Sequence, residues 1–202
     1  VVKTRKWWLF GSKTTVYPKV TEIGKSVFSG CSSLTEIAIP SSVTEIDPSA
    51  FSGCSSLGKI VVEEGHPKYD SREGCNAIIE TATNKLIRGC KNTIIPNDIK
   101  RISEYAFVGC SGLKKIRFPK RVEEIGYRAF SGCSGLESIS ISSSVESISF
   151  GAFENCTSLK SITIPSSVKN MDGSAFMGCV NLKSIEVDKN NKVYDSREDC
   201  NA

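Results

Sequence analysis

The strongest constraint on how this chain can fold is a 23-residue repeat marked by cysteines. The cysteine intervals 31 to 54, 110 to 133, 133 to 156 and 156 to 179 are all 23 residues long. Aligned on these positions, the block AFSGCSSLGKI recurs as AFVGCSGLKKI, AFSGCSGLESI, AFENCTSLKSI and AFMGCVNLKSI. A fixed period of about 20–30 residues predicts a solenoid, because each unit can bury its apolar face only against its neighbours.

Each repeat contains two short apolar runs that read as strands. The alternation in LxxIxI, from Leu34 to Ile39, predicts a strand with one face inward, and VxxI predicts a second strand after Pro40. Proline suits the turn between them because it donates no hydrogen bond. The sequence therefore predicts a β-rich solenoid, a right-handed superhelix of the leucine-rich-repeat type. We expect parallel sheets, about six or seven coils, and short helical or 3-10 turns at the AFSGC blocks.

Two columns of repeated side chains are expected to line the interior, about 4.8 Å apart from coil to coil. The residue before each column cysteine is Gly30, Gly53, Gly89, Gly109, Gly132, Gly178 or, once, Asn155, which predicts a backbone with positive φ. Parallel stacking keeps Cβ atoms farther apart than the ~3.8 Å of a disulfide, so we expect free thiols. The ladder residues are Cys31, Cys54, Cys90, Cys110, Cys133, Cys156, Cys179, Phe28, Phe51, Phe107, Phe130, Phe153 and Phe176.

The repeat is interrupted once, between Cys54 and Cys110. After the loop EEGHPK and the motif YDSREGC, the runs NAIIE and KLIRG predict a β-hairpin, with Ile79 opposite Leu86 and Glu80 opposite Lys85. The motif YDSREGCNA (69–77) returns as YDSREDCNA (194–202). We expect a single solenoid domain, 1–202. Its parts are a cap and degenerate first coil (1–30), regular coils (31–62), an inserted hairpin module (63–95), regular coils (96–187) and the start of a second, truncated module (188–202).

Composition excludes several classes of function. A net charge of +4 is too small to indicate a nucleic-acid-binding protein, and no apolar run reaches the roughly 18 residues needed to cross a bilayer. The N-terminal VVKTRKWWLF has too short an apolar run for a secretory signal. Cysteine clusters of the C-x2–4-C kind are absent from the sequence, so we expect no metal site and no cofactor. Trp7 and Trp8 are interpreted as a cap of the core, with sugar binding as the alternative.

The YDSREGC motif looks reactive but lacks a partner for catalysis. A nucleophilic Cys75 would need a base, His66 is the only histidine, and the second copy has none. We therefore expect no enzyme activity. Cys75 is either a packing residue or bonded to Cys90. Asp70, Ser71 and Arg72 are interpreted as turn formers and charge partners, with calcium or partner binding as the alternative.

The better functional candidate is a basic cluster. Residues 100–121 hold seven cations against Glu104, a net +6. One interpretation is a solvated surface on which Glu123 and Glu124 pair with some of the cations, and the other is a patch for an anionic partner. We expect the binding surface on the strand face around Lys59, Lys115 and Arg117. The candidate partner-binding residues are Lys59, Lys100, Arg101, Lys114, Lys115, Arg117, Lys120 and Arg121.

The 23-residue unit AFSGCSSLTEIAIPSSVTEI and the stretch YDSREGCNAIIETATNKLIRGCKNTIIPN resemble the BspA-like leucine-rich repeats of surface proteins from Bacteroides-type bacteria, over roughly residues 14–202. This resemblance implies a curved parallel-β solenoid located extracellularly, at the bacterial cell surface. Members of that family include adhesins that bind fibronectin or fibrinogen. The implied function is non-enzymatic recognition and adhesion, by a monomer, to host extracellular-matrix proteins, mucin or other cell-surface glycoproteins. A passive spacer in a larger surface protein is the alternative.

Overall fold

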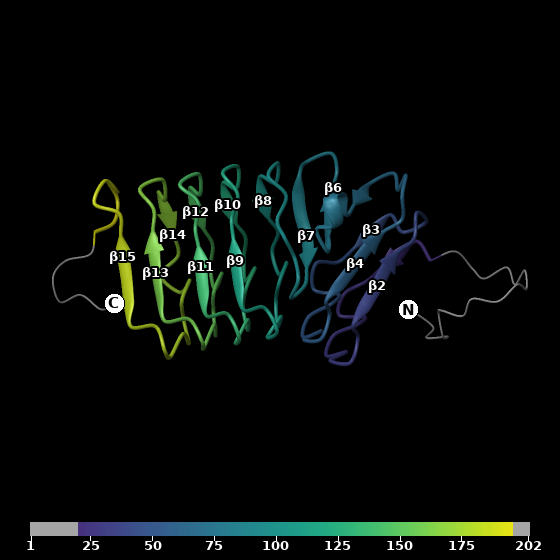
Figure 1. The fold of residues 1–202 in the computed structure, drawn as a ribbon, viewed down its shortest axis with the longest axis horizontal. Coiled ribbons are helices and arrows are strands. Elements are labelled where there is room, and N and C mark those ends of the chain that lie inside the picture. The colour runs from purple at the N-terminus through teal and green to yellow at the C-terminus, as the bar shows by residue number, and fades with distance from the viewer. Residues whose placement is uncertain (1–19, 196–202) are drawn as a thin grey trace, which may run out of the picture.

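The computed structural model describes residues 20–195, which form an elongated stack of coils (Figure 1). Equivalent strands of successive coils pair in parallel, with Lys115 opposite Ser138 and Glu36 opposite Lys59, each pair 23 residues apart. Identical apolar residues thereby come into contact from coil to coil. The predicted parallel β-solenoid is confirmed.

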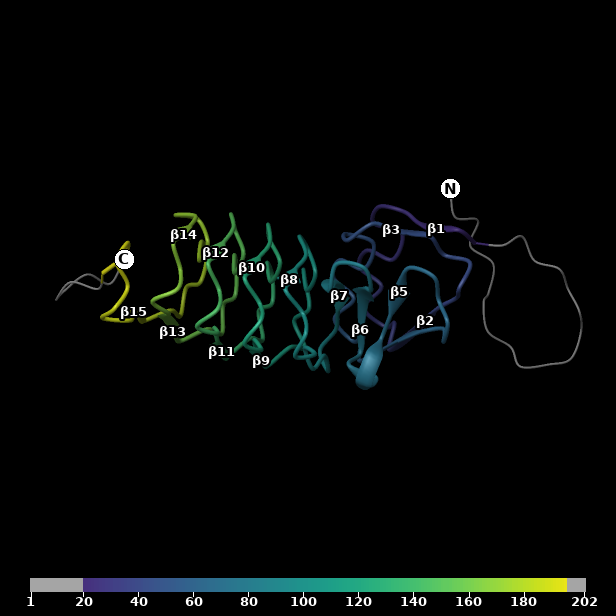
Figure 2. The same ribbon diagram turned by 90° about the horizontal axis from the view of Figure 1, so that it is seen from above.

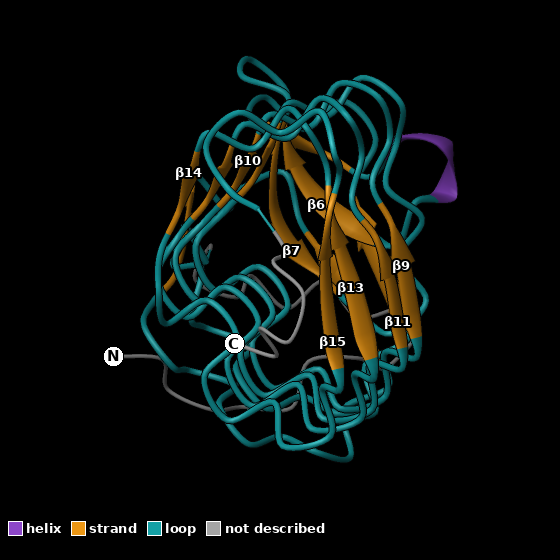
Figure 3. Ribbon diagram, turned by 90° about the vertical axis from the view of Figure 1, so that its left-hand side faces the viewer, coloured by secondary structure: helices purple, strands orange, loops and turns teal. Residues whose placement is uncertain are grey.

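Each regular coil contributes two strands, which lie on different sides of the coil when it is seen end-on (Figure 3). The first strands form one face, here called the strand face: β2 (Glu36–Ile39), β4 (Lys59–Val62), β9 (Lys115–Arg117), β11 (Ser138–Ser140), β13 (Ser161–Ile164) and β15 (Ser184–Val187). The second strands are β1 (Glu22–Ile23), β3 (Glu45–Ile46), β8 (Arg101–Ile102), β10 (Glu124–Ile125), β12 (Ser147–Ile148) and β14 (Asn170–Met171).

The inserted segment folds as β5 (Tyr69–Asp70), η1 (Arg72–Gly74), β6 (Ala77–Glu80) and β7 (Lys85–Gly89). β6 and β7 pair antiparallel in the expected register, with Ile79 opposite Leu86 and Glu80 opposite Lys85. β7 then pairs in parallel with β8, so the hairpin joins a seven-stranded sheet of order β14-β12-β10-β8-β7-β6-β5. Seen from above, the hairpin lies between the N-terminal and C-terminal coils (Figure 2).

The hairpin divides the hydrophobic core into two clusters because both of its faces are buried. Ile78 and Ile87 pack with the N-terminal coils, whereas Ile79 and Leu86 pack with the C-terminal coils. Consecutive residues of a strand point to opposite faces of the sheet, so Ile78 and Ile79 serve different clusters. The strands β2 and β4 are tilted relative to β9, β11, β13 and β15 in Figure 1, so the change in strand direction coincides with this insertion.

The cysteine column is held by hydrogen bonds from thiols to the carbonyl oxygens of the preceding coil's phenylalanines. The Cys54 Sγ lies 3.1 Å from the Phe28 oxygen, and Cys133, Cys156 and Cys179 repeat this contact at 3.1–3.3 Å. All eight described cysteines are free thiols. Cys31 departs from the expected buried ladder: it is exposed because no described coil covers it on its N-terminal side.

The phenylalanine column forms two stacks instead of one. Phe28 stacks on Phe51 at 5.2 Å, and the second stack runs from Phe107 through Phe130 and Phe153 to Phe176 at 4.7–5.5 Å. In the second stack, the outermost ring, Phe176, is only partly buried.

The side chain of Arg88, on β7, lies in the core at the junction of the two stacks. It is 1% exposed, and its guanidinium donates to the carbonyl oxygens of Phe51 (2.7 Å) and Tyr105 (3.0 Å). Phe51 is in the last coil of the N-terminal stack, and Tyr105 lies in the turn of the coil that starts the C-terminal stack. Arg88 therefore ties the two halves of the solenoid together across the insertion.

The expectation of short helical turns at the AFSGC blocks needs correction. The blocks are turns, and the described residues contain one 3-10 helix, η1, which lies in the YDSREGC motif. Residues with positive φ, such as Arg128 and Gly132, interrupt each block before a helical turn can continue. The predicted positive φ holds at Gly30, Gly53, Gly109, Gly132, Gly178 and Asn155.

Gly89 is the exception in that column. It ends strand β7, where a Cβ would lie 2.1 Å from the Phe107 ring, so glycine is needed there for space rather than for a positive φ. Trp7 and Trp8, interpreted from the sequence as a cap of the core, lie outside the described residues.

Candidate interaction surface

The strand face changes character along the solenoid. Its outward side chains are Lys59 and Val61 on β4, then Lys115 and Arg117 on β9. The next strands, β11 and β13, present only serine and threonine. Strand residues alternate inward and outward, so Ile116 is buried between its two exposed cationic neighbours. The face is therefore basic in its middle and rich in hydroxyl groups beyond it.

Three of the eight predicted basic residues form ion pairs with the neighbouring coil. Lys59 contacts Glu36 at 2.7 Å, Arg101 contacts Glu124 at 3.5 Å, and Lys114 contacts Glu137 at 3.5 Å. The pairing expected between the Lys100–Arg101 and Glu123–Glu124 rungs is thus present for Arg101. These side chains are largely exposed, so each pair contributes about 0–1 kcal/mol to stability, but it neutralises its cation.

The other five predicted cations are exposed, and within residues 20–195 none of them forms an ion pair. Four belong to one coil, in β9 and in the turn that follows Pro119. The five are Lys100, Lys115, Arg117, Lys120 and Arg121. The structure thus leaves a smaller group of free cations than the sequence cluster contained.

Arg121 stands where other coils use a serine to bond neighbouring coils. The hydroxyls of Ser42, Ser144 and Ser167 each donate to a valine carbonyl oxygen of the preceding coil, at 2.7–2.8 Å. Arg121 occupies the equivalent position, 23 residues before Ser144, and has no hydroxyl. In the coil of β9, a cation thus replaces the serine that bonds to the preceding coil elsewhere.

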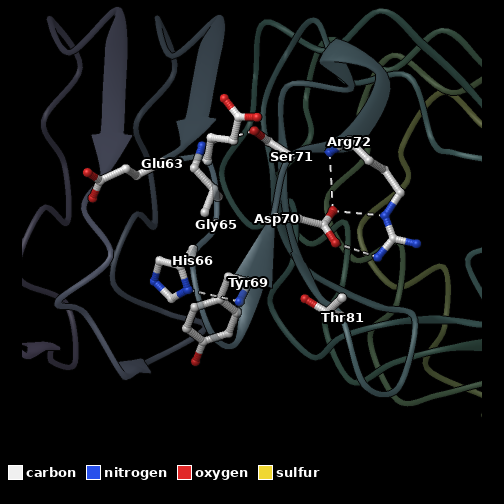
Figure 4. Close-up of a pocket in the computed structure, with 10 residues that line it drawn as sticks. Glu63, Gly65, His66, Tyr69, Asp70, Ser71, Arg72 and Thr81 are labelled. Atoms are coloured by element: carbon white, nitrogen blue, oxygen red, sulfur yellow. Dashed lines mark hydrogen bonds and ion pairs between the residues drawn. The ribbon is translucent and has the colours of Figure 1, made fainter.

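A second candidate is a pocket of about 310 Å³ beside the insertion, lined by the loop 62–66 and by the start of YDSREGC (Figure 4). Several of its polar groups are bonded within the chain. The Arg72 guanidinium contacts Asp70, Asp98 and the Asn84 side chain, and the Ser71 Oγ accepts a bond from the Val62 amide. These contacts fasten the hairpin to the coils on both sides.

The pKa values agree with a structural role for this cluster. Burial would raise the pKa of Asp70, but hydrogen bonds from Arg72 outweigh it and hold that pKa below its usual value. The hydrogen bond from Arg72 to Asp70 likewise raises the pKa of the guanidinium. Both groups stay charged and engaged with each other at neutral pH. The expected role of Arg72 in holding a carboxylate is confirmed.

His66 is a buried structural residue of the same loop. Its Nδ1 accepts hydrogen bonds from the backbone amides of Lys68 (3.1 Å) and Tyr69 (3.0 Å). In the second copy of the module, Asn191 Oδ1 accepts from the amides of Val193 and Tyr194, both at 2.9 Å. Histidine and asparagine fill equivalent positions, 125 residues apart, with the same bonds. His66 therefore shapes the loop in the way that asparagine does in the copy.

Cys75 is poorly suited to nucleophilic chemistry. It is 1% exposed, it packs in the C-terminal core cluster, and burial raises the pKa of its thiol to about 11. The Cys75 Sγ has the Ala77 oxygen as its hydrogen-bond partner, at 3.9 Å. The His66 Nδ1, the candidate base, is engaged by two backbone amides and not by this thiol. In the part of the chain that the structure describes, no group of histidine, cysteine or carboxylate side chains could hold a metal ion.

Sequence reasoning missed two features of this region. Arg88, predicted only as part of a hairpin strand, is buried, and Ile94, after the hairpin, is 74% exposed. Both lie in the one segment where the 23-residue period fails, so no repeated column could show their environment. Between residues 20 and 195, no helix is long and apolar enough to cross a bilayer.

Comparison with known proteins agrees with the fold. The family model described as "BspA type Leucine rich repeat region (6 copies)" matches residues 12–83 and 77–198. The pneumococcal vaccine antigen PcpA aligns with a TM-score of 0.67 at 29% identity, covering 78% of this chain and 40% of that one. A leucine-rich cell surface protein of Faecalibacterium prausnitzii aligns with a TM-score of 0.62 at 32% identity, over 83% and 51% of the two chains.

A leucine-rich repeat protein of Bacteroides ovatus is 34% identical and covers 83% of this chain and 41% of its own, with a TM-score of 0.56. The chain thus spans about half or less of the length of these three relatives. None of the proteins with curated functions matches it. The relatives from Faecalibacterium prausnitzii and Bacteroides ovatus are leucine-rich repeat proteins, and the first is a cell surface protein. With the family model matching most of its length, the chain belongs to the BspA-type leucine-rich repeat family.

Proposed function

We propose that this chain is a non-enzymatic recognition module of an extracellular, cell-surface protein. Its partners are host matrix proteins, mucin or other cell-surface glycoproteins, which it contacts through the strand face. The contribution of the repeats is a rigid scaffold, because each coil is fixed by hydrogen bonds and stacked rings to the next. A surface-protein role is supported by the cell surface relative from Faecalibacterium prausnitzii.

The observation that carries this proposal is the set of free cations on one coil. A coil that only extended a stack could keep the serine and threonine pattern of β11 and β13, as well as the serine that bonds the preceding coil. The coil of β9 instead presents Lys115, Arg117, Lys120 and Arg121 without carboxylate partners among the described residues. Unpaired charges on a rigid surface favour recognition of a partner of opposite charge and speed its association.

The test is a binding screen against immobilised fibronectin, fibrinogen and mucin, with two double variants of equal charge change. In Lys115→Glu/Arg117→Glu the proposed surface is reversed. In Lys160→Glu/Lys183→Glu two exposed lysines on more C-terminal coils are reversed instead. We expect at least a tenfold loss of affinity in the first variant and less than a threefold loss in the second.

Equal affinity of the wild type and Lys115→Glu/Arg117→Glu for a verified ligand would overturn the proposal. Failure of the wild type to bind any cell-surface partner would instead favour the alternative, a passive spacer in a larger surface protein.

A further inference from the structure

The strand face is interrupted between β4 and β9 by the segment that follows the hairpin. Pro96 follows Cys90 by six positions, whereas in the regular coil Pro40 follows Cys31 by nine. The segment passes between the two coils, because a Cβ built at Gly58 or at Gly112 would lie 3.1 Å from atoms of the Lys91 side chain. The insertion therefore replaces one strand of this face with a shorter, irregular segment, residues 91–96, which we call the crossing.

This crossing forms no ladder with its neighbours. The Ile94 amide bonds to the Cys75 oxygen and the Thr93 amide to the Cys90 oxygen, both at 3.1 Å. Among the described residues, residues 93–95 share no backbone hydrogen bond with β4 or β9. β9 consequently pairs with β11 alone, and the position that another coil would fill with a paired strand is left without one.

One consequence is an aliphatic surface next to the free cations. Thr93 and Ile95 are buried, at 8% and 7% exposure, while Ile94 between them is 74% exposed and directed outward. Val61, an outward residue of β4 in the coil before this crossing, is 37% exposed. The outward residues of β9 belong to the coil after it. We call Val61, Ile94, Lys115 and Arg117 the aliphatic–basic patch.

Two other cations on strands of regular coils are matched by carboxylates on the strand beside them. Lys59 on β4 faces Glu36 on β2, and Arg101 on β8 faces Glu124 on β10, in register and within ion-pair distance. Lys115 and Arg117 face Ser138 and Ser140 on β11, and Lys91, at the start of the crossing that carries Ile94, lies against Gly112 just before β9. Lys115 and Arg117 therefore face no carboxylate on β11.

We propose that the aliphatic–basic patch binds an extended acidic segment of a partner protein. Its carboxylates lie on Lys115 and Arg117, and one of its apolar side chains lies on Ile94 and Val61. This inference rests on the proposed function and adds the chemical class of the partner. Lys115 and Arg117 are two residues apart on a strand, about 6.6 Å, which matches alternate side chains of an extended peptide. A sulfated glycan would supply anions but leave the aliphatic side chains uncovered.

Two synthetic twelve-residue peptides and one glycan probe test this inference by titration at low salt. Both peptides carry four alternating glutamates, one has a central phenylalanine and the other a serine there, and heparin is the glycan probe. We expect the phenylalanine peptide to bind about tenfold more tightly than the serine peptide. Ile94→Ser should abolish that difference, while Val180→Ser, which changes a similarly exposed valine at 77%, should retain it.

The outcomes separate this inference from the function on which it rests. Tighter binding of heparin than of either peptide, unaffected by Ile94→Ser but lost in Lys115→Glu/Arg117→Glu, would overturn the peptide inference and leave the strand face as the recognition surface. A verified ligand whose affinity survives Lys115→Glu/Arg117→Glu would overturn both. Equal affinity of the two peptides for the wild type also overturns the inference.

Discussion

At the scale of single residues, the two module copies show that one loop shape can be held by different side chains. His66 and Asn191 each accept two backbone amides with one atom. Asn191 also donates its Nδ2 to the carbonyl oxygens of Pro165 and Val168, whereas the buried Nε2 of His66 has no hydrogen-bond partner. The only histidine of the chain is therefore a loop residue, for which asparagine is an adequate substitute.

His66→Asn should consequently fold with a stability equal to or above that of the wild type. His66→Ala removes both accepted hydrogen bonds and should lower the free energy of unfolding by about 1–3 kcal/mol. Urea denaturation followed by circular dichroism measures both. The structural assignment is wrong if the asparagine variant loses as much stability as the alanine variant.

The reactivity of the thiols should follow their burial, both in the cysteine column and at Cys75. Cys31 is exposed, while Cys75 and Cys110 are 1% exposed and burial raises the pKa of each thiol to about 11. We expect iodoacetamide at pH 8 to modify Cys31 in the native protein well before Cys75 or Cys110, as peptide mapping by mass spectrometry can show. Rapid, selective modification of Cys75 would contradict its assignment as a packing residue.

At the scale of the elements, the hairpin β6–β7 separates the two hydrophobic core clusters, and its packing depends on Gly89. A Cβ at this residue would approach Phe107 Cε1 to 2.1 Å, in a ring that stacks on Phe130. At Gly173, by contrast, a Cβ would meet no atom within 4 Å. Gly89 is confined by the phenylalanine stack, whereas Gly173 has room for a side chain, so the second serves as a control for the first.

Gly89→Ala should lower the free energy of unfolding by about 1–3 kcal/mol, because the ring or the strand must move to make room. Gly173→Ala should change it by less than about 0.5 kcal/mol. The comparison uses thermal or urea unfolding of the two variants. A Gly89→Ala variant as stable as Gly173→Ala would mean that β7 does not lie against the ring stack.

The sequence predicted the environment of a side chain correctly where that side chain contacts the equivalent residue of the next coil. Phe130 stacks between Phe107 and Phe153, and Cys133 bonds to the coil before it, so the period alone predicts both. The hairpin register was predictable from local pairing. The burial of Arg88 and the exposure of Ile94 were not, since both depend on how an aperiodic segment crosses the interior. Of the eight basic residues predicted to bind a partner, the five without ion pairs could be identified only once the partners on neighbouring strands were known.

At the scale of the whole molecule, the buried thiols make stability sensitive to alkaline pH. Burial raises the pKa of Cys75 and Cys110 to about 11, from 9.0 for an ordinary thiol. Because the raised pKa belongs to the folded state, the stabilisation is fully present below about pH 9. It is lost as the pH rises towards 11, where the unfolded chain releases protons that the folded chain retains.

We therefore expect the urea midpoint to be constant from pH 7 to 8.5 and to fall between pH 9 and 11. Cys110→Ala should reduce the size of that fall, because one such thiol is removed. A midpoint that does not change up to pH 11 would contradict the burial of the column.

The solenoid as a whole is a stack of coils held together by parallel strand pairs and stacked rings, and its strand face carries Lys115 and Arg117 without ion pairs among the described residues. Hydrogen exchange of the protein with and without a verified ligand locates the contact surface most directly. We predict slower exchange in peptides that cover 58–62, 91–96 and 112–122, with no change in the second strands at 145–150 and 168–172. Protection confined to the second strands, or to the loop 62–66 and its pocket, would contradict the assignment of recognition to the strand face.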